Sequence, residues 1–187
     1  MATVDELLHR VEVLENRFQE LSHREQVLED TREIEGLKIR FMEACDVPGE
    51  RYNSQVIADM FTADGILDEG PDIGVVLHGR TEIREFYDKA RAEWIKFGAH
   101  YLMNPVVEVK GDSATGRWYF FEPFTYAPTS EAYWCAARWE DEFLKVERRW
   151  LIKKANFFLW FMSPFDKGWE KKRFPWENKS IDEENHL

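Results

Sequence analysis

One histidine of this chain lies where acid–base chemistry would be possible. His100 heads the stretch "HYLMNPVVEVKGDSATGRWYFF", whose alternation of apolar and polar residues predicts two long strands joined by a tight turn. An imidazole can take up and return a proton near neutral pH. It can equally be a hydrogen-bonded structural group, and the residues alone leave both interpretations of His100 open.

Other residue types that carry chemistry form no recognisable cluster in the sequence. The remaining histidines lie in charged or loop segments, where we expect them to be solvated: His9, His23, His78 and His186. Cys45 and Cys135 match no metal or redox spacing, so we expect two buried free thiols. The sequence also has no glycine-rich phosphate loop. It therefore predicts neither a metal site nor a cofactor.

The composition favours a small-molecule cavity over a nucleic-acid or membrane surface. Eight Trp and fourteen Phe among 187 residues exceed what a plain core needs, so we expect an aromatic-lined cavity. The net charge of −11 argues against nucleic acid and anionic membranes as main partners. The N-terminal segment lacks the apolar core of a signal peptide, and no apolar run approaches about 18 residues. We therefore expect a cytoplasmic protein.

The first segment, residues 1–31, has the pattern of a heptad helix. Its apolar positions follow alternating steps of four and three, broken only at Glu25: Leu7, Val11, Leu14, Phe18, Leu21 and Leu28. Most other positions are charged. The pattern predicts either a helical arm that associates between subunits or an amphipathic helix that lies on its own domain.

Helical and short extended segments follow the arm. A helix is expected over residues 31–46, ending before a Pro-Gly turn, and a short helix over 53–61, capped by Asn53 or Ser54. A third helix is expected over 79–97, capped by Thr81. Between the second and third helices, the expected strands are 62–70 and 74–77.

From residue 99 the apolar period changes from 3.6 to 2, which predicts an antiparallel meander. The expected strands are Ala99–Lys110, Ser113–Tyr126, Glu131–Val146 and Arg149–Phe161. Helices followed by a meander predict an α+β domain over residues 32–164, in which a curved antiparallel sheet wraps around helices and forms a cone-shaped pocket. The polar residues 165–187 are expected to be a tail.

The order of these elements and several local strings resemble a known family. The strings "IEGLKIRFMEACD", "MFTADGILDEG", "GRTEIREFY" and "HYLMNPVVEVKGDSATGRWY" are similar to the SnoaL-like branch of the nuclear transport factor 2-like (cystatin-like cone) superfamily. The resemblance covers residues 32–164. Within that branch the similarity is greatest to the bile-acid dehydratases, and it extends to hexachlorocyclohexane dehydrochlorinases and scytalone dehydratases.

The resemblance implies a catalytic pair. In those lyases an Asp at the end of the first domain helix holds a His at the start of the first long strand, and the matching residues here are Asp46 and His100. A carboxylate on one imidazole nitrogen fixes the tautomer and stabilises the imidazolium formed when the other nitrogen takes a proton. His100 is thus the expected general base. Without this resemblance, Asp46 could simply cap the helix or form part of the turn. The resemblance also implies a homo-oligomer, with a trimer favoured.

The chain lacks several of the hydrogen-bonding side chains of the dehydratase pattern. A Tyr of the dehydratases is replaced by Phe41, a second His by Met103, and a C-terminal Arg falls on an apolar position near Leu159. A general acid must then come from elsewhere, and the candidates are Tyr52, Glu69, Tyr101 and Tyr119.

Because successive side chains of a strand point to opposite faces, the sequence indicates which residues could contact a substrate. Asn104 shares a strand face with His100 unless Pro105 adds a bulge. On the next strand we expect one face to point inward, because Ala114 and Gly116 leave room for a ligand there; its other members are Trp118, Phe120 and Glu122. The two aromatic residues of this face either contact the ligand or belong to a plain core. Arg138 either binds a substrate carboxylate or carbonyl or forms a surface ion pair. Phe41, Tyr52, Glu69, Tyr101 and Tyr119 complete the expected substrate contacts.

These expectations combine into a cofactor-independent lyase of dehydratase type. The expected substrate is a hydrophobic hydroxylated ring compound, such as a steroid, a terpenoid or a lignin-type aromatic. Because Phe41 removes the dehydratase's phenol, C–C cleavage with loss of an aldehyde and isomerisation stay open. A non-catalytic small-molecule-binding or interaction module of the same fold is the alternative from another class.

Overall fold

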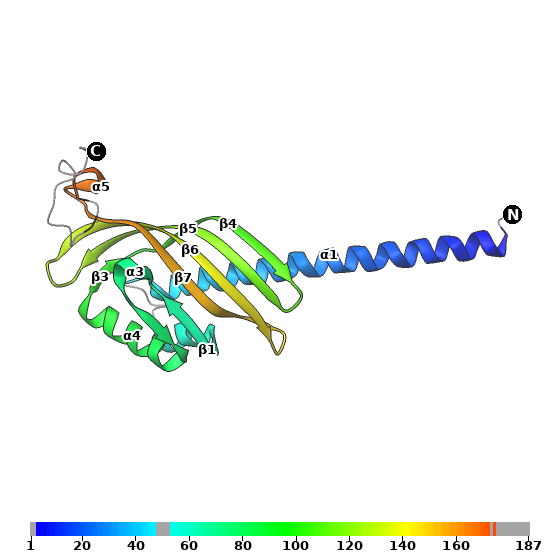
Figure 1. Ribbon diagram of the computed structural model, residues 1–187, viewed down its shortest axis with the longest axis horizontal. Helices are drawn as coiled ribbons and strands as arrows, with labels where there is room; N and C mark the ends of the chain where they lie inside the picture. The colour runs from blue at the N-terminus through cyan, green and yellow to red at the C-terminus, as the bar shows by residue number, and fades with distance from the viewer. Residues whose placement is uncertain (1–2, 48–52, 173, 175–187) are drawn as a thin grey trace.

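A single helix runs from the arm into the body. In this computed structural model, which describes residues 3–47, 53–172 and 174, α1 spans Val4–Cys45 (Figure 1). Thr3 and Glu6 form a capping box at its start, because each side chain bonds the backbone N–H of the other residue. The two helical segments expected from the sequence are therefore one continuous helix.

The C-terminal third of α1 lies inside the body. Ile34, Leu37 and Phe41 are buried on one face of the helix. Asp30 marks where the helix enters, and its Oδ1 accepts hydrogen bonds from Lys145 Nζ at 2.5 Å and Trp150 Nε1 at 2.8 Å. These bonds join α1 to the last two strands, and the arm N-terminal to Asp30 extends away from the body (Figure 1).

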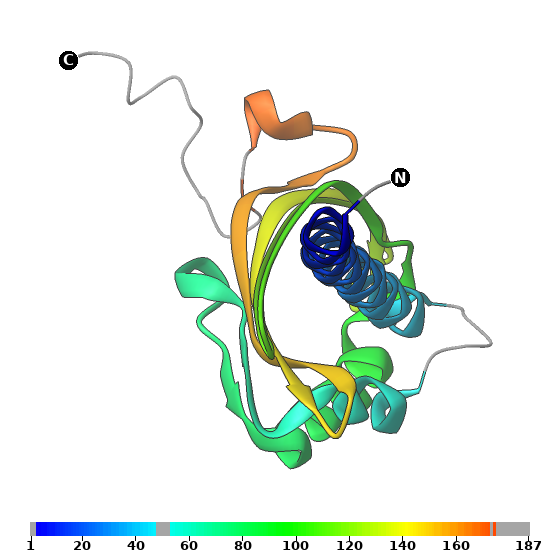
Figure 2. The same ribbon diagram turned by 90° about the vertical axis from the view of Figure 1, so that its right-hand side faces the viewer.

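One seven-stranded sheet curls around α1 (Figure 2). Its order is β2-β1-β7-β6-β5-β3, and β4 also pairs with β5. The parallel pair is β1 with β7, and the other pairs are antiparallel. The strands are β1 (Phe61–Asp68), β2 (Val76–His78), β3 (Ile95–Gly98), β4 (Tyr101–Lys110), β5 (Ser113–Tyr126), β6 (Glu131–Val146) and β7 (Arg149–Pro164). The predicted α+β class with a curved sheet around a helix is confirmed.

Short helices complete the body. The α2 helix (Ser54–Asp59) has Asn53 as its N-cap, as the sequence predicted. The others are α3 (Gly70–Ile73), α4 (Gly79–Glu93) and α5 (Gly168–Lys171). In the part of the chain that the structure describes, no helix is both long and apolar enough to cross a membrane.

The structure corrects several predicted boundaries. The third helix ends at Glu93 instead of residue 97, and Ile95–Gly98 forms a strand on the edge of β5. Thr81 lies inside α4, which begins at Gly79, so it is not the cap of that helix. The strand expected from Ala99 begins at Tyr101. This last difference matters for the site, because His100 lies in a break between two strands and not within one.

The alternation of β5 was predicted correctly. Trp118, Phe120 and Glu122 are buried on the concave face, whereas Arg117 and Tyr119 are exposed on the convex face. The space above Gly116 is nevertheless not open to a ligand. A Cβ added there would lie 2.1 Å from Cη2 of Trp118, so the indole of Trp118 fills that space.

Candidate active site

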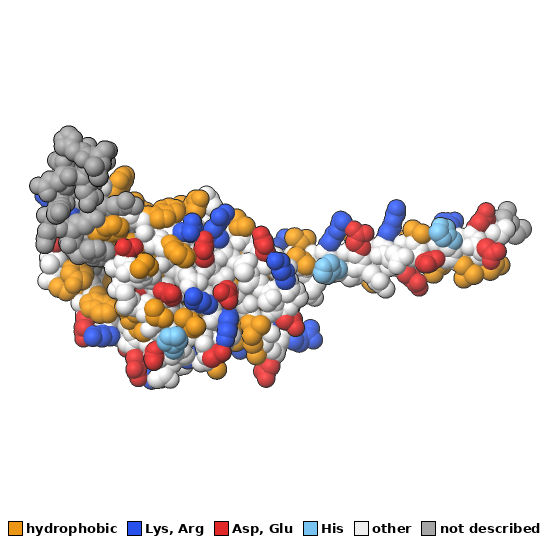
Figure 3. Space-filling model, viewed as in Figure 1, with side chains coloured by type: hydrophobic (Ala, Val, Ile, Leu, Met, Phe, Trp, Pro, Cys, Tyr) orange, Lys and Arg blue, Asp and Glu red, His pale blue; other side chains and the backbone are white. Residues whose placement is uncertain are grey.

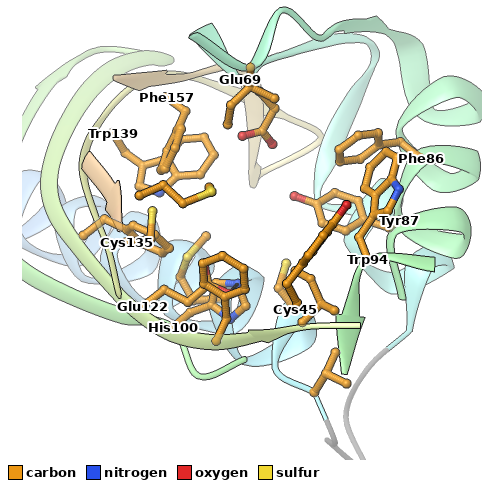
Figure 4. Close-up of a pocket in the computed structure, with 18 of the residues that line it drawn as sticks. Cys45, Glu69, Phe86, Tyr87, Trp94, His100, Glu122, Cys135, Trp139 and Phe157 are labelled. Atoms are coloured by element: carbon orange, nitrogen blue, oxygen red, sulfur yellow. Dashed lines mark ion pairs between the residues drawn. The ribbon is translucent and has the colours of Figure 1, made fainter. Parts of the chain in front are cut away.

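The concave side of the sheet encloses a cavity of about 420 Å³ between α1, α4 and the strands (Figure 4). Aromatic side chains make up much of its wall, as the composition suggested. The sequence did not single out several of them, because helical and strand residues far apart in the chain meet here: Phe86, Tyr87, Trp94, Trp139 and Phe157. His100, Glu69, Phe120 and Glu122 are the sequence-nominated residues that line the cavity.

His100 reaches this cavity because the sheet edge is interrupted. Neither Ala99 nor His100 belongs to a strand, and both β3 and β4 pair with different parts of β5. Opposite the break lies Pro123, which has no N–H to donate, although its carbonyl accepts from Ala99 N at 3.2 Å. The backbone N–H of His100 donates to Asp46 outside the sheet, and the imidazole is 11% exposed.

Asp46 holds His100 in two ways. Its Oδ1 accepts a hydrogen bond from the backbone N of His100 at 2.8 Å and lies 2.9 Å from Nδ1 of the ring. Asp46 is the C-cap of α1, and the next residue, Val47, forms a pair of backbone hydrogen bonds with Gly98. This bridge brings together two side chains that are 54 residues apart in the sequence.

Glu122 approaches the other nitrogen of the ring. Its Oε1 lies 3.5 Å from Nε2 of His100, and this oxygen is buried without a hydrogen-bond partner among the described residues. The carboxylate fits because residue 98 is glycine, since a Cβ there would lie 2.8 Å from Oε1 of Glu122. His100 thus lies between two carboxyl groups, one on each ring nitrogen.

The electrostatics of this trio raise the pKa of the imidazole. Burial lowers the pKa of His100, but the Glu122 carboxylate and the hydrogen bond to Asp46 outweigh it, so the pKa lies above its usual value. Burial raises the pKa of Glu122, and the charge of His100 opposes this only in part. Burial would also raise the pKa of Asp46, but the bonds from His100 reverse this and lower it. Of the two carboxyl groups, Asp46 is therefore the one whose surroundings favour the anion.

Glu69 supplies a further carboxyl group to the cavity. It follows β1 and directs its carboxyl group into the cavity, with His100 and Glu122 on the facing wall (Figure 4). Burial raises its pKa to about 7, although the charge of Lys38 opposes the shift. A carboxyl with this pKa is protonated in a large fraction of molecules near neutral pH, so it can donate a proton as well as accept one.

Other sequence-nominated contacts lie away from the cavity, which corrects those expectations. Tyr101, Asn104 and Tyr119 are exposed, and Asn104 has a φ of 52° in the irregular stretch between Met103 and Val106. Arg138 forms an ion pair with Glu140 at 2.9 Å on the convex face, which was the stated alternative.

Two aromatic candidates belong to the core. Phe41 is fully buried and packs edge-on against Phe61, and Trp118 packs against Phe143. Neither lines the cavity. Phe41, which replaces the dehydratase Tyr, is thus a core residue in this body. Tyr52 lies outside the described residues.

Cys45 and Cys135 also line the cavity, and both are free and buried, as expected. Burial holds the pKa of both thiols well above the usual value, so they are protonated. Among the described residues, no group of three or more His, Cys, Asp or Glu side chains is placed to hold a metal ion.

Comparison with known proteins places the chain in a broad group. Residues 26–156 match the family described as the SnoaL-like domain. None of the curated proteins matches. A solved structure from Novosphingobium aromaticivorans, provisionally named an aromatic ring hydroxylase, is 26% identical, with a TM-score of 0.65 over 73% of this chain and 94% of its own.

Two further solved structures share the fold at lower identity. A type 2 hexachlorocyclohexane dehydrochlorinase is 16% identical, with a TM-score of 0.65 over 73% of this chain and 89% of its own. A protein from Novosphingobium aromaticivorans, provisionally named a scytalone dehydratase, is also 16% identical, with a TM-score of 0.65 over 74% and 89% of the two chains. Structural neighbours of this chain thus carry dehydrochlorinase and dehydratase names.

Proposed function

Because the chain belongs to the SnoaL-like domain family, we propose that it is a cofactor-independent lyase that uses His100 as its general base. The observation that carries the proposal is the placement of His100. Its Nδ1 contacts Asp46 at 2.9 Å, while the ring borders an apolar cavity. This arrangement fixes the ring at the wall of the cavity, with Nε2 facing Glu122, and a substrate bound there would give its proton to Nε2.

The two carboxyl groups beside His100 favour the product of proton abstraction. When Nε2 takes a proton from a C–H or O–H group, the imidazolium gains the attraction of both Asp46 and Glu122. Glu122 is close enough to share the proton on Nε2 after modest movement. We assign Asp46 as the orienting partner and Glu122 as a second acceptor for the proton.

Glu69 is the best-placed general acid of the three sequence candidates that the structure describes. It lines the cavity and carries a raised pKa of about 7, whereas Tyr101 and Tyr119 are exposed. In a dehydration the base removes one proton and the acid delivers another to the leaving hydroxyl, so water leaves without a metal ion. Glu69 and His100 would divide these two tasks.

The cavity wall defines the substrate class. Aromatic rings around it favour a hydrophobic ring compound, and the hydroxyl that leaves must lie near Glu69. The charged groups on the wall within the described residues are Glu69, Asp72, Glu122 and, when protonated, His100. A neutral hydroxylated steroid, terpenoid or lignin-type aromatic fits this wall better than a carboxylate.

The test is a survey of neutral hydroxylated ring compounds by mass spectrometry. The expected product has lost one water, and loss of an aldehyde or an isomer of unchanged mass would assign the same base to C–C cleavage or isomerisation. In His100→Ala, turnover should fall by about 10²-fold or more. Tyr119→Phe is the matched control, because Tyr119 lies on the convex face, and its turnover should not change. Tight binding of a compound without turnover, or full activity of His100→Ala, would contradict the proposal.

A further inference from the structure

The arm exposes an apolar stripe that the body does not cover. Its members recur at steps of three and four along α1, and each is at least 49% exposed: Leu7, Val11, Leu14, Phe18, Leu21 and Leu28. The space-filling view shows apolar side chains along the arm between charged ones (Figure 3). A stripe of this length on one helix is the seam of a coiled coil that lacks its partner helix.

The geometry of α1 prevents the body from covering this stripe. Leu14 in the arm and Phe41 in the body are 27 positions apart, which at about 100° per residue places their side chains about 180° apart around the helix. Because Phe41 points into the body, the stripe points away from it. Ile39, which is 51% exposed, continues the stripe beyond the arm on the outer side of the helix.

The charges beside the stripe select one orientation of a partner helix. With Val11 and Phe18 at a positions and the leucines at d positions, Arg10, Arg17 and Arg24 occupy g, and Glu15 and Glu29 occupy e. In a parallel pair in register, a g residue meets the e residue five positions later on the other chain.

Two complementary contacts follow from this rule. Arg10 would meet Glu15 of the partner subunit, and Arg24 would meet Glu29 of the partner subunit. An antiparallel pair would instead place g beside g and e beside e, which brings like charges together. The sequence of the arm thus favours a parallel pair of identical chains.

The surface of the arm has a matching hollow. Val11, Leu14, Glu15, Phe18 and Gln19 line it. Four residues at successive a, d, e and a positions form the kind of hole that receives one d side chain of the facing helix. In a parallel pair in register, that side chain is Leu14 of the partner subunit.

We propose that the arm pairs with the arm of a second copy of this chain as a parallel, in-register, two-stranded coiled coil. Val11 at an a position with leucines at d favours two strands over three, whereas Phe18 and Glu25, also at a positions, carry no such preference. This count differs from the trimer that the family resemblance implied. Glu25, the charged a position, would face its own counterpart and weaken the pair at that layer.

A cross-linking experiment on the full chain tests the orientation. In Leu14→Cys, the new thiols would face each other across the seam, and oxidised glutathione should join most chains into a disulfide-linked dimer. Glu12→Cys is the matched control, because position 12 is exposed on the face of the arm opposite the stripe and should give little dimer. The native Cys45 and Cys135 are buried and leave the background low. Equal cross-linking of the two variants, or none in Leu14→Cys, would overturn the proposal.

A charge swap tests the register and the number of strands. Arg10→Glu should weaken the dimer roughly tenfold, since each dimer contains two such contacts, and adding Glu15→Arg should restore it. Arg10 is preferable to Arg24, which forms an ion pair with Glu20 of its own chain at 2.5 Å. Light scattering should give a dimer mass for the unmodified chain. A monomer or a trimer, or a tighter complex in Arg10→Glu, would contradict the parallel two-stranded pair.

Discussion

The two ends of α1 differ in which side chains they expose and which they bury. In the arm, Phe18 is 71% exposed and its charged neighbours flank it, whereas in the body Lys38 is fully buried. Lys38 Nζ lies 2.8 Å from Asp141 Oδ2 and 3.8 Å from the ring centroid of Trp139. The same helix thus exposes an apolar stripe to a partner at one end and buries an ion pair inside the sheet at the other.

This contrast shows what each end of the helix does. A buried ion pair contributes little net stability to the fold. Removing either member is nevertheless strongly destabilising, because the other charge is left unpaired inside the body. An exposed apolar stripe does not stabilise the isolated chain, because its surface is removed from water only when another helix covers it. Substitutions at the two ends should therefore have distinct effects. Those in the body should change the stability of the fold, and those in the arm should change the association of chains.

The largest effect should come from Lys38→Met. It leaves Asp141 buried without its cation, which should lower the free energy of unfolding by about 3–5 kcal/mol. Chemical denaturation measures this, and Arg40→Met, an exposed change on the same helix, is the control, expected within about 0.5 kcal/mol of the parent chain. Equal stability of the two variants would show that the ion pair does not anchor α1 in the body.

A smaller, pH-dependent effect should come from Glu69 in the cavity. Its pKa is raised from 4.5 to about 7 in the folded chain, so the stabilisation it gives is complete below pH 4.5 and is lost as the pH rises to about 7. Relative to Glu69→Gln, the parent chain should lose at most about 3 kcal/mol of unfolding free energy across this window.

Denaturation curves of both proteins at several pH values measure the difference. Asp141 has a pKa raised to about 6 by burial, but it is present in both chains, so its contribution cancels. A constant difference between the two proteins would mean that Glu69 titrates at its ordinary value, and this would remove it as the general acid.

The smallest effect should come from Glu25→Leu in the arm. It completes the apolar seam and should tighten association of the arms by about 1–2 kcal/mol, while unfolding of the body stays unchanged. Sedimentation equilibrium measures the association. Stabilisation of the body without tighter association would mean that residue 25 contacts the body, contrary to the opposite directions of the two faces of α1.

Much of the difference between the arm and the body could be predicted from the sequence, because it depends on local periodicity. The heptad steps from Leu7 to Leu28 and the alternation of β5 each depend on neighbours within a few residues. The continuity of α1 was missed, because the apolar positions change to the opposite face of the helix between Leu28 and Ile34, which looks like two helices although no proline separates them.

The cavity was harder to predict because it depends on long-range contacts. Trp94, Tyr87 and Trp139 look like ordinary core residues in the sequence, and only the curl of the sheet brings them to one wall. The pairing of Asp46 with His100 came from resemblance to a family. The place of Glu122 beside Nε2 depends on Gly98, whose role no local pattern reveals.

Asp46 and Glu122 hold His100, the proposed base, with a raised pKa inside the cavity. An NMR titration of the His100 imidazole, in the parent chain and in Asp46→Asn, tests it most directly, because no substrate is needed. We predict a pKa above the usual histidine value in the parent chain and a clearly lower one in Asp46→Asn. The same ordinary pKa in both proteins would contradict the account.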